Sequence, residues 1–292
     1  MEFEALRFFI CFAGCAVATY YDLFNRRNVP TWLSYSLVGM GVIFTFATFN
    51  PSLIFYNLSV GFVVFVIGYL LYITGQIGGA DVLLFVSIAL LLPEAPHPLL
   101  TPTYFNSGFP FVVSVFMLSG MLGVFGVFLK YVPVTLYNYV KGEKLLINRT
   151  TALLSAITLI LYMALLYTLT SIVELSQLQL AVFTAVIICA TFTFALKEHI
   201  AEKYMIKMVG VDEIDEEDIL AVEKMDEEFV KRHNLRKLLT LSEIEKLKKI
   251  GKRKKFPVYK EMPVFMPYVL IALLFSVLFG DPLGYLLPIL FE

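Results

Sequence analysis

Gly78-Gly79-Ala80-Asp81-Val82-Leu83-Leu84 begins one of the long apolar stretches of this sequence and places an aspartate at its start. A second aspartate closes the first apolar stretch, in Tyr20-Tyr21-Asp22. A carboxylate at membrane depth is energetically costly, so it marks a candidate functional site for which a partner has to be named. Asp22 and Asp81 are natural partners for each other.

The composition around these two aspartates is that of a multi-pass membrane protein. Apolar residues make up 59% and charged residues 16% of the 292 positions, against about half and about a quarter in soluble domains. An apolar helix of about 20 residues crosses a bilayer. The predicted fold class is an all-α polytopic membrane protein of about eight transmembrane helices, the fourth of them short. The predicted spans are 4–21, 31–49, 53–74, 77–92, 110–130, 151–173, 177–196 and 263–279.

The distribution of lysine and arginine predicts how these spans are oriented. Basic residues accumulate on cytoplasmic segments, and with these spans all 23 of them except Arg7 fall on one face. Both termini are then expected outside. Two complete spans separate Asp22 from Asp81, so both are expected at the cytoplasmic face, where they can meet. An error of one span would put about 30 Å of hydrocarbon between them.

The sequence further suggests three segments. Residues 1–196 hold the first seven spans with both aspartates, 197–260 form a charged insertion on the cytoplasmic side, and 261–292 hold the last span. The insertion has an acidic and a basic half, and both are expected to be helical. Thr240 and Glu243 have the spacing of a capping box at the start of one of these helices. A net charge of −1 gives no indication of nucleic-acid binding, and the bilayer is the expected environment.

Metal and cofactor chemistry is not expected. The three cysteines, Cys11, Cys15 and Cys189, all lie in apolar spans, and no Cys-x-x-Cys pair or histidine cluster provides a zinc site. Cys11 and Cys15 share one helix face and are expected to be small core residues.

A pair of carboxylates is by itself a complete acid/base system. Two carboxylates held about 3 Å apart cannot both ionise, so they share a proton. The ionised one can then take a proton from water while the protonated one donates to a peptide carbonyl, as in aspartic proteases. Gly78 and Gly79 before Asp81 allow close approach of backbone or of an extended substrate. A plainer interpretation is that Asp81 caps the helix that it begins.

The motifs around both aspartates resemble those of the archaeal preflagellin and prepilin peptidases, membrane aspartic proteases of the GxGD type related to bacterial type IV prepilin peptidases. Asp22-Leu23-Phe24-Asn25-Arg26-Arg27-Asn28-Val29-Pro30 is similar to the first-aspartate segment, with the basic Arg26 four positions after the aspartate. Gly78-Gly79-Ala80-Asp81 is similar to the GxGD segment. The resemblance implies catalytic roles for Asp22 and Asp81, and an active-site loop that includes Gly78, Gly79, Ala80 and Arg26.

This resemblance also implies a substrate. Leader-bearing pilin or archaellin precursors, with a short basic leader before an apolar helix, would be cut at the cytoplasmic membrane face without a cofactor. The sequence departs from the family pattern at Ala80, where GxGD has glycine, and in the additional spans at 151–196. It also lacks the four-cysteine element of the bacterial enzymes.

Two alternatives share the same aspartates. A presenilin-like or signal-peptide-peptidase-like intramembrane protease also pairs Tyr-Asp with GxGD, but its aspartates lie on consecutive spans and it has a Pro-Ala-Leu motif that is absent here. A proton- or cation-coupled transporter would use Asp22 and Asp81 as ion ligands. The predicted position of both acids near one membrane face, away from the midplane, favours the protease.

Overall fold

The computed structural model describes residues 4–24, 29–100, 107–172, 175–251 and 255–286. Each of the eight predicted spans contains one apolar helix, which confirms a polytopic helical membrane protein. The apolar helices are α1 (Glu4–Phe24), α2 (Thr31–Phe46), α3 (Pro51–Ile73), α4 (Gly79–Leu91), α5 (Phe111–Val140), α6 (Arg149–Ile172), α7 (Gln177–Ala195) and α11 (Met266–Phe279). Five are long and apolar enough to cross a membrane, whereas α2, α4 and α11 are shorter. The predicted fifth span ends at Lys130, whereas α5 continues to Val140.

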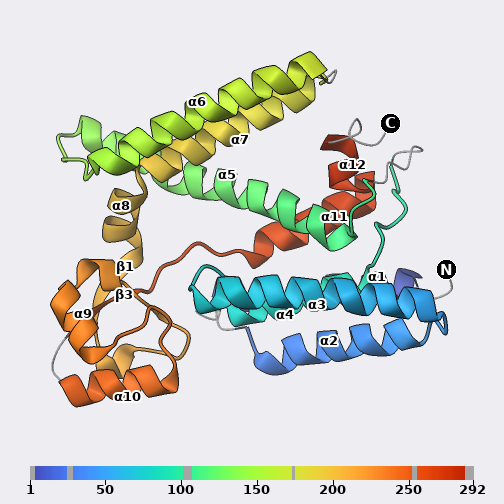
Figure 1. The fold of residues 1–292 in the computed structure, drawn as a ribbon, viewed down its shortest axis with the longest axis horizontal. Helices are drawn as coiled ribbons and strands as arrows, with labels where there is room; N and C mark the ends of the chain where they lie inside the picture. The colour runs from blue at the N-terminus through green and yellow to red at the C-terminus, as the bar shows by residue number, and fades with distance from the viewer. Residues whose placement is uncertain (1–3, 25–28, 101–106, 173–174, 252–254, 287–292) are drawn as a thin grey trace.

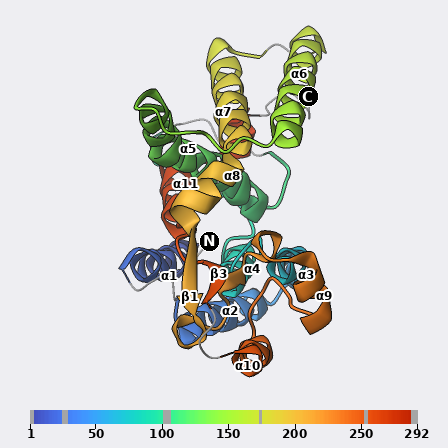
Figure 2. The same cartoon turned by 90° about the vertical axis from the view of Figure 1, so that its left-hand side faces the viewer.

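The helices form two groups joined by α5 and α11 (Figure 1). In the first group α4 packs against α2 and α3, and α1 packs on α2, α4 and α11. In the second group α6 and α7 form an antiparallel hairpin, and α7 also packs on α5. Because α11 contacts both α1 and α5, the last apolar helix connects the two groups (Figure 2).

The short helix α4 lies at the centre of the first group. Its 13 residues rise about 20 Å, less than the roughly 30 Å of a hydrocarbon core, and most of its side chains are buried. Neighbouring helices approach it closely at glycines: a Cβ atom built on Gly41 lies 2.7 Å from Leu90 Cβ, and one built on Gly61 lies 3.0 Å from Leu90 Cδ2. Small residues are what close helix packing in membranes requires.

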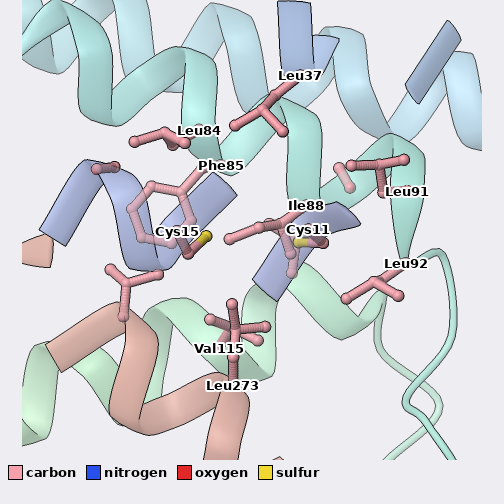
Figure 3. Packing of buried hydrophobic residues seen from close by; sticks show 14 of the residues in the cluster. Cys11, Cys15, Leu37, Leu84, Phe85, Ile88, Leu91, Leu92, Val115 and Leu273 are labelled. Carbon is pink, nitrogen blue, oxygen red and sulfur yellow. The ribbon is translucent and has the colours of Figure 1, made fainter. Parts of the chain in front are cut away.

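A buried apolar cluster fills the space where α1, α4, α5 and α11 meet (Figure 3). Cys11 and Cys15 of α1 are both free thiols with 1% exposure. They pack in the same cluster as Ile88 of α4, Val115 of α5 and Leu273 of α11. The prediction that Cys11 and Cys15 are core residues is therefore confirmed.

Arg7, the single exception in the predicted distribution of basic residues, has a structural explanation. Its guanidinium donates a hydrogen bond of 3.0 Å to the carbonyl of Leu90 in the last turn of α4. The final carbonyls of a helix lack intrahelical partners and carry partial negative charge. Arg7 thus satisfies the end of α4 that lies farthest from Asp81.

The insertion between α7 and α11 differs from the prediction, because it contains a small sheet as well as helices. Its elements are α8 (Lys197–Ile200), a π-helical turn (Ala201–Met205), β1 (Ile206–Gly210), 3-10 turns (Val211–Glu213 and Val222–Lys224), β2 (Ile219–Leu220), α9 (Glu227–His233), α10 (Leu241–Ile250) and β3 (Lys255–Tyr259). The antiparallel strands have the order β1-β3-β2. The strands were not predicted because the alternation of apolar and polar residues in them is short. The strands that pair are also far apart along the chain.

A separate apolar core supports this sheet. Leu220 and Val258 from the strands pack with Leu239 and with Leu247 of α10, all with no exposed surface. Thr240 stands at the N-cap of α10 as predicted, but its side chain makes no capping hydrogen bond. Its hydroxyl instead shares a 2.9 Å hydrogen bond with Ser242, so the predicted capping box is wrong.

The two ends of the bundle differ. The insertion lies at one end, and the start of α1 and the short α12 (Pro282–Leu286) lie at the other (Figure 1). Asp281 is buried at this second end, where it accepts hydrogen bonds from the backbone N–H groups of Ser107 at 2.8 Å and Leu283 at 3.0 Å. It is a structural residue that begins α12.

Candidate active site

Asp22 lies in the last turns of α1 and is only 8% exposed. Its Oδ2 atom accepts hydrogen bonds from the backbone N–H groups of Phe265 at 2.9 Å and Met266 at 3.0 Å. These two residues begin α11. The free N–H groups and the positive end of a helix dipole are favourable partners for a carboxylate. The end of α1 and the start of α11 are joined through this one side chain.

Asp81 lies in the first turn of α4. Its Oδ2 atom accepts a hydrogen bond of 3.3 Å from the backbone N–H of Gly78, so Asp81 does cap the helix that it begins, as the plainer interpretation expects. The side chain is half-buried and also lines a large cavity. Asp81 therefore caps α4 through Oδ2 and also contributes to the lining of the cavity.

The glycines before Asp81 occupy crowded positions. A Cβ atom built on Gly79 lies 3.2 Å from both Glu217 Oε1 and Tyr72 Cε2, and one built on Gly78 lies 3.2 Å from Asp81 Oδ2. Ala80 behaves differently, because it packs against the apolar cluster of α1, α4, α5 and α11 and does not line the cavity. An alanine is therefore accommodated at the one position where the sequence departs from GxGD. Arg26 lies outside the described residues.

Asp22 at the end of α1 and Asp81 at the start of α4 lie near enough to influence each other electrostatically. Asp22 and Asp81 repel each other electrostatically, and Glu217 acts on Asp81 in the same sense. Asp22 itself does not line the cavity, but Phe265, whose backbone N–H donates a hydrogen bond to Asp22, does. That the two aspartates form a pair at one membrane face stays a prediction.

A cavity of about 1200 Å³ extends from Asp81 between the two helix groups. Its walls come from α3, the loop before α4, α5, α6, α7, the segment leading into α11, and the insertion. Most of its lining is apolar, with Phe116, Tyr162, Leu166 and Phe183 among the larger side chains. The additional helices α6 and α7 thus form the wall that faces Asp81 across the cavity.

Sequence reasoning missed Glu217. This residue belongs to the insertion, lines the cavity, and accepts a hydrogen bond of 3.2 Å from the hydroxyl of Tyr72 in α3. Its only signal in the sequence is membership of an acidic run, which does not distinguish it from its neighbours. Within the described ranges, no group of three or more His, Cys, Asp or Glu side chains is arranged to hold a metal ion.

Comparison with known proteins gives two matches over the N-terminal part of the chain. Residues 9–137 match the model of the type IV leader peptidase family. The prepilin peptidase EppA of Methanothermobacter thermautotrophicus is 29% identical over 118 residues, which cover 39% of this chain and 30% of that protein. The chain therefore spans less than a third of this relative's length.

No solved structure matches the chain. Asp22, Asp81 and the glycines before Asp81 all fall within the segment matched by the family model, whereas α6, α7, the insertion and α11 lie beyond it. Over residues 9–137, fewer than half of its positions, the chain is therefore similar to the type IV leader peptidases.

Proposed function

We propose that this protein is a membrane-embedded aspartic endopeptidase that removes the short leader of pilin or archaellin precursors. The observation that carries the proposal is the electrostatic interaction of Asp22 with Asp81, the second of which lines a large apolar cavity. Both residues lie in the segment similar to leader peptidases. An apolar cavity beside two carboxylates suits a peptide whose cleavage site adjoins an apolar helix.

In the proposed reaction the two carboxylates share one proton and bind one water molecule between them. The ionised carboxylate removes a proton from the water, whose oxygen attacks the carbonyl carbon of the scissile peptide, while the other carboxyl group donates its proton to the carbonyl oxygen. The carbon–nitrogen bond then breaks, and a proton passes to the leaving amine. The leader departs with a new carboxylate, and no cofactor enters the reaction.

The proposed orientation follows from the basic residues. The insertion carries most of the lysines and arginines, so it belongs in the cytoplasm by the positive-inside rule. The aspartates lie at the same end of the bundle, which puts the cleavage at the cytoplasmic face and both termini outside. In this orientation a basic leader stays in the cytoplasm while the following apolar helix lies in lipid.

The transporter alternative has less support. An ion path needs polar groups along its length, whereas the lining of this cavity is mainly apolar and Asp81 lies at its edge. The consecutive-span pattern of the presenilin-like proteases does not fit either, because α2 and α3 separate the two aspartate-bearing helices.

A cleavage assay in proteoliposomes tests the proposal. The purified protein is mixed with a panel of pilin-type and archaellin-type precursors, and mass spectrometry identifies the new N-termini. Leader removal by the unaltered protein, and its loss in the Asp22→Asn and Asp81→Asn variants, is the expected result. Cleavage that persists in both variants would refute the aspartate pair, and aspartate-dependent proton flux without cleavage of any precursor would favour the transporter.

A further inference from the structure

Glu217, in the lining of the cavity, has an unusual backbone conformation. Its φ angle is 70°, in the left-handed region that residues with a Cβ atom seldom adopt. The backbone N–H of Glu217 donates a 2.9 Å hydrogen bond to the carbonyl of Leu239, which fixes the loop in this shape. The conformation directs the side chain toward the hydroxyl of Tyr72 and the first residues of α4.

Glu217 differs from two nearby aspartates in its charge partners. Asp215, two positions before it, and Asp218, directly after it, both form ion pairs with Lys260. Within the described residues Glu217 forms no ion pair, and its carboxylate accepts a hydrogen bond only from the neutral Tyr72 hydroxyl. An exposed carboxylate without an ion pair of its own is able to bind an incoming cation.

Asp81, the second carboxylate of the cavity lining, increases this preference for a cation. Asp81 lies close enough to Glu217 for the two carboxylates to repel each other, so a positive group between them is attracted to both. Lys197 is the third charged residue of the lining. Its ammonium group lies 4.3 Å from the centre of the Phe194 ring, at the end of α7, and forms no ion pair with Glu217.

The shape of the cavity defines the rest of the ligand. Behind Glu217 and Asp81 the walls are mainly apolar and come from α5, α6 and α7. A ligand that matches both parts has an apolar segment and, at one end of it, a lysine or arginine side chain. If Glu217 binds the charged end, the backbone that follows the basic residue would lie beside Asp81.

We propose that Glu217 is a specificity-determining residue that binds a lysine or arginine side chain on the leader side of the cleaved bond. The proposal rests on the proposed function for the identity of the ligand as a leader-bearing precursor. It also gives a purpose to the insertion, which brings an acidic residue of the cytoplasmic part over a site built from α1, α4 and α11.

The experiment compares precursors that differ only in the residues just before the cut, with lysine, glutamine or glutamate there. Glu217→Gln keeps an acceptor for the Tyr72 hydroxyl and removes the charge, and Glu217→Lys reverses it. Glu213→Gln is the matched control, because Glu213 is also exposed in the same acidic run but does not line the cavity. Values of kcat/KM are measured for every pair of protein and precursor.

With the lysine precursor, we expect Glu217→Gln to lower kcat/KM about tenfold through KM, the effect of one lost charge pair. The glutamine precursor is expected to be cleaved equally by the unaltered protein and by Glu217→Gln. Glu217→Lys should cleave the glutamate precursor better than the lysine precursor. Equal losses with all precursors, or no loss with any, would overturn the role of Glu217.

A binding measurement separates this inference from the proposed function. The Asp81→Asn protein in nanodiscs is titrated with fluorescent peptides that carry the apolar segment and either a lysine or a glutamine end. Tighter binding of the lysine peptide, lost when Glu217→Gln is added, supports the specificity site even if no precursor is cleaved. Cleavage by the unaltered protein without any preference for the lysine peptide would leave the protease proposal standing and refute the site.

Discussion

Asp22 and Phe265 are hydrogen-bonded at 2.9 Å although 243 positions of sequence separate them. The carboxylate at the end of α1 therefore holds the start of α11, and the same carboxylate is one of the two groups that we propose to activate water. Substitutions at Asp22 affect both properties. Variants at this position therefore have to distinguish a loss of stability from a loss of catalytic activity.

Asparagine and leucine at position 22 separate the two roles. Asp22→Asn keeps a side-chain oxygen that can accept from Phe265 and Met266 but cannot exchange a proton, so we expect near-normal thermal stability and a loss of cleavage of at least a hundredfold. Asp22→Leu removes the acceptor as well and should lower the free energy of unfolding by about 1.5–3 kcal/mol. Thermal unfolding in detergent and the cleavage assay measure the two effects. Substantial cleavage by Asp22→Asn would contradict a catalytic role.

Asp81→Asn makes the same separation at the second carboxyl group. The amide oxygen can still cap the N–H of Gly78, so the loss of stability is expected to stay below about 1 kcal/mol. The cleavage rate should nevertheless fall at least a hundredfold, because the amide neither takes nor gives a proton. If cleavage falls only in proportion to stability, Asp81 is a helix cap and nothing more.

Ala80→Gly restores the glycine of the GxGD pattern. Because Ala80 packs against the apolar cluster and does not line the cavity, we expect kcat/KM to change by less than about threefold. The free energy of unfolding should fall by up to about 1 kcal/mol, since glycine is a poorer helix former than alanine. A large gain in activity in the cleavage assay would mean that Ala80 restricts the substrate directly.

Gly41 and Gly39 in α2 form a matched pair for testing the packing of α4. An added Cβ at Gly41 meets Leu90 at 2.7 Å, whereas one at Gly39 has nothing within 4 Å. Gly41→Ala should lower the free energy of unfolding by about 1–3 kcal/mol through overpacking. Gly39→Ala should be neutral or stabilising by up to about 1 kcal/mol. Equal melting temperatures for the two variants would contradict the close approach of α2 and α4.

Lys260 supports the loop that carries Glu217. Burial by itself lowers the pKa of Lys260, but the hydrogen bonds and charges of Asp218 and Asp215 together raise it above its ordinary value of 10.5. The stability that these ion pairs contribute is thus full below pH 10.5 and is lost as the pH rises through the raised pKa.

Lys260→Met should therefore lower the stability of the insertion by about 1–3 kcal/mol at pH 7, because Asp218 loses its partner. Lys231→Met, which breaks an exposed ion pair with Glu227, should cost no more than about 0.5 kcal/mol. Hydrogen exchange of the backbone amides in β2 and β3 measures the loss of stability in each variant. Similar exchange in the two variants would show that the Lys260 ion pairs do not support the sheet.

The membrane part was largely predictable from the sequence because each apolar stretch has one structural solution in lipid. A helix satisfies its own backbone groups there, so the apolar helices followed from the length and composition of each stretch. The close surroundings of Gly78 and Gly79 suit residues without a side chain, whereas the pairing of Asp22 with Asp81 stays a prediction.

The rest depends on contacts between distant segments, to which no local pattern points. The hydrogen bonds from Phe265 and Met266 to Asp22 and the position of Glu217 beside Tyr72 depend on how α11 and the insertion fold back onto the bundle. The strands β1 and β3 pair across about fifty positions of sequence and are too short and too charged to show a clear period of two.

The dependence of Asp22 on α11 has a consequence for biosynthesis. Helices enter a membrane in chain order, and α11 is the last of the apolar helices. Until α11 has been inserted, Asp22 lacks its two N–H donors and the cavity lacks one of its walls. A chain whose translation stops before Phe265 holds both aspartates without a finished site, so the two aspartates alone are not enough to form it.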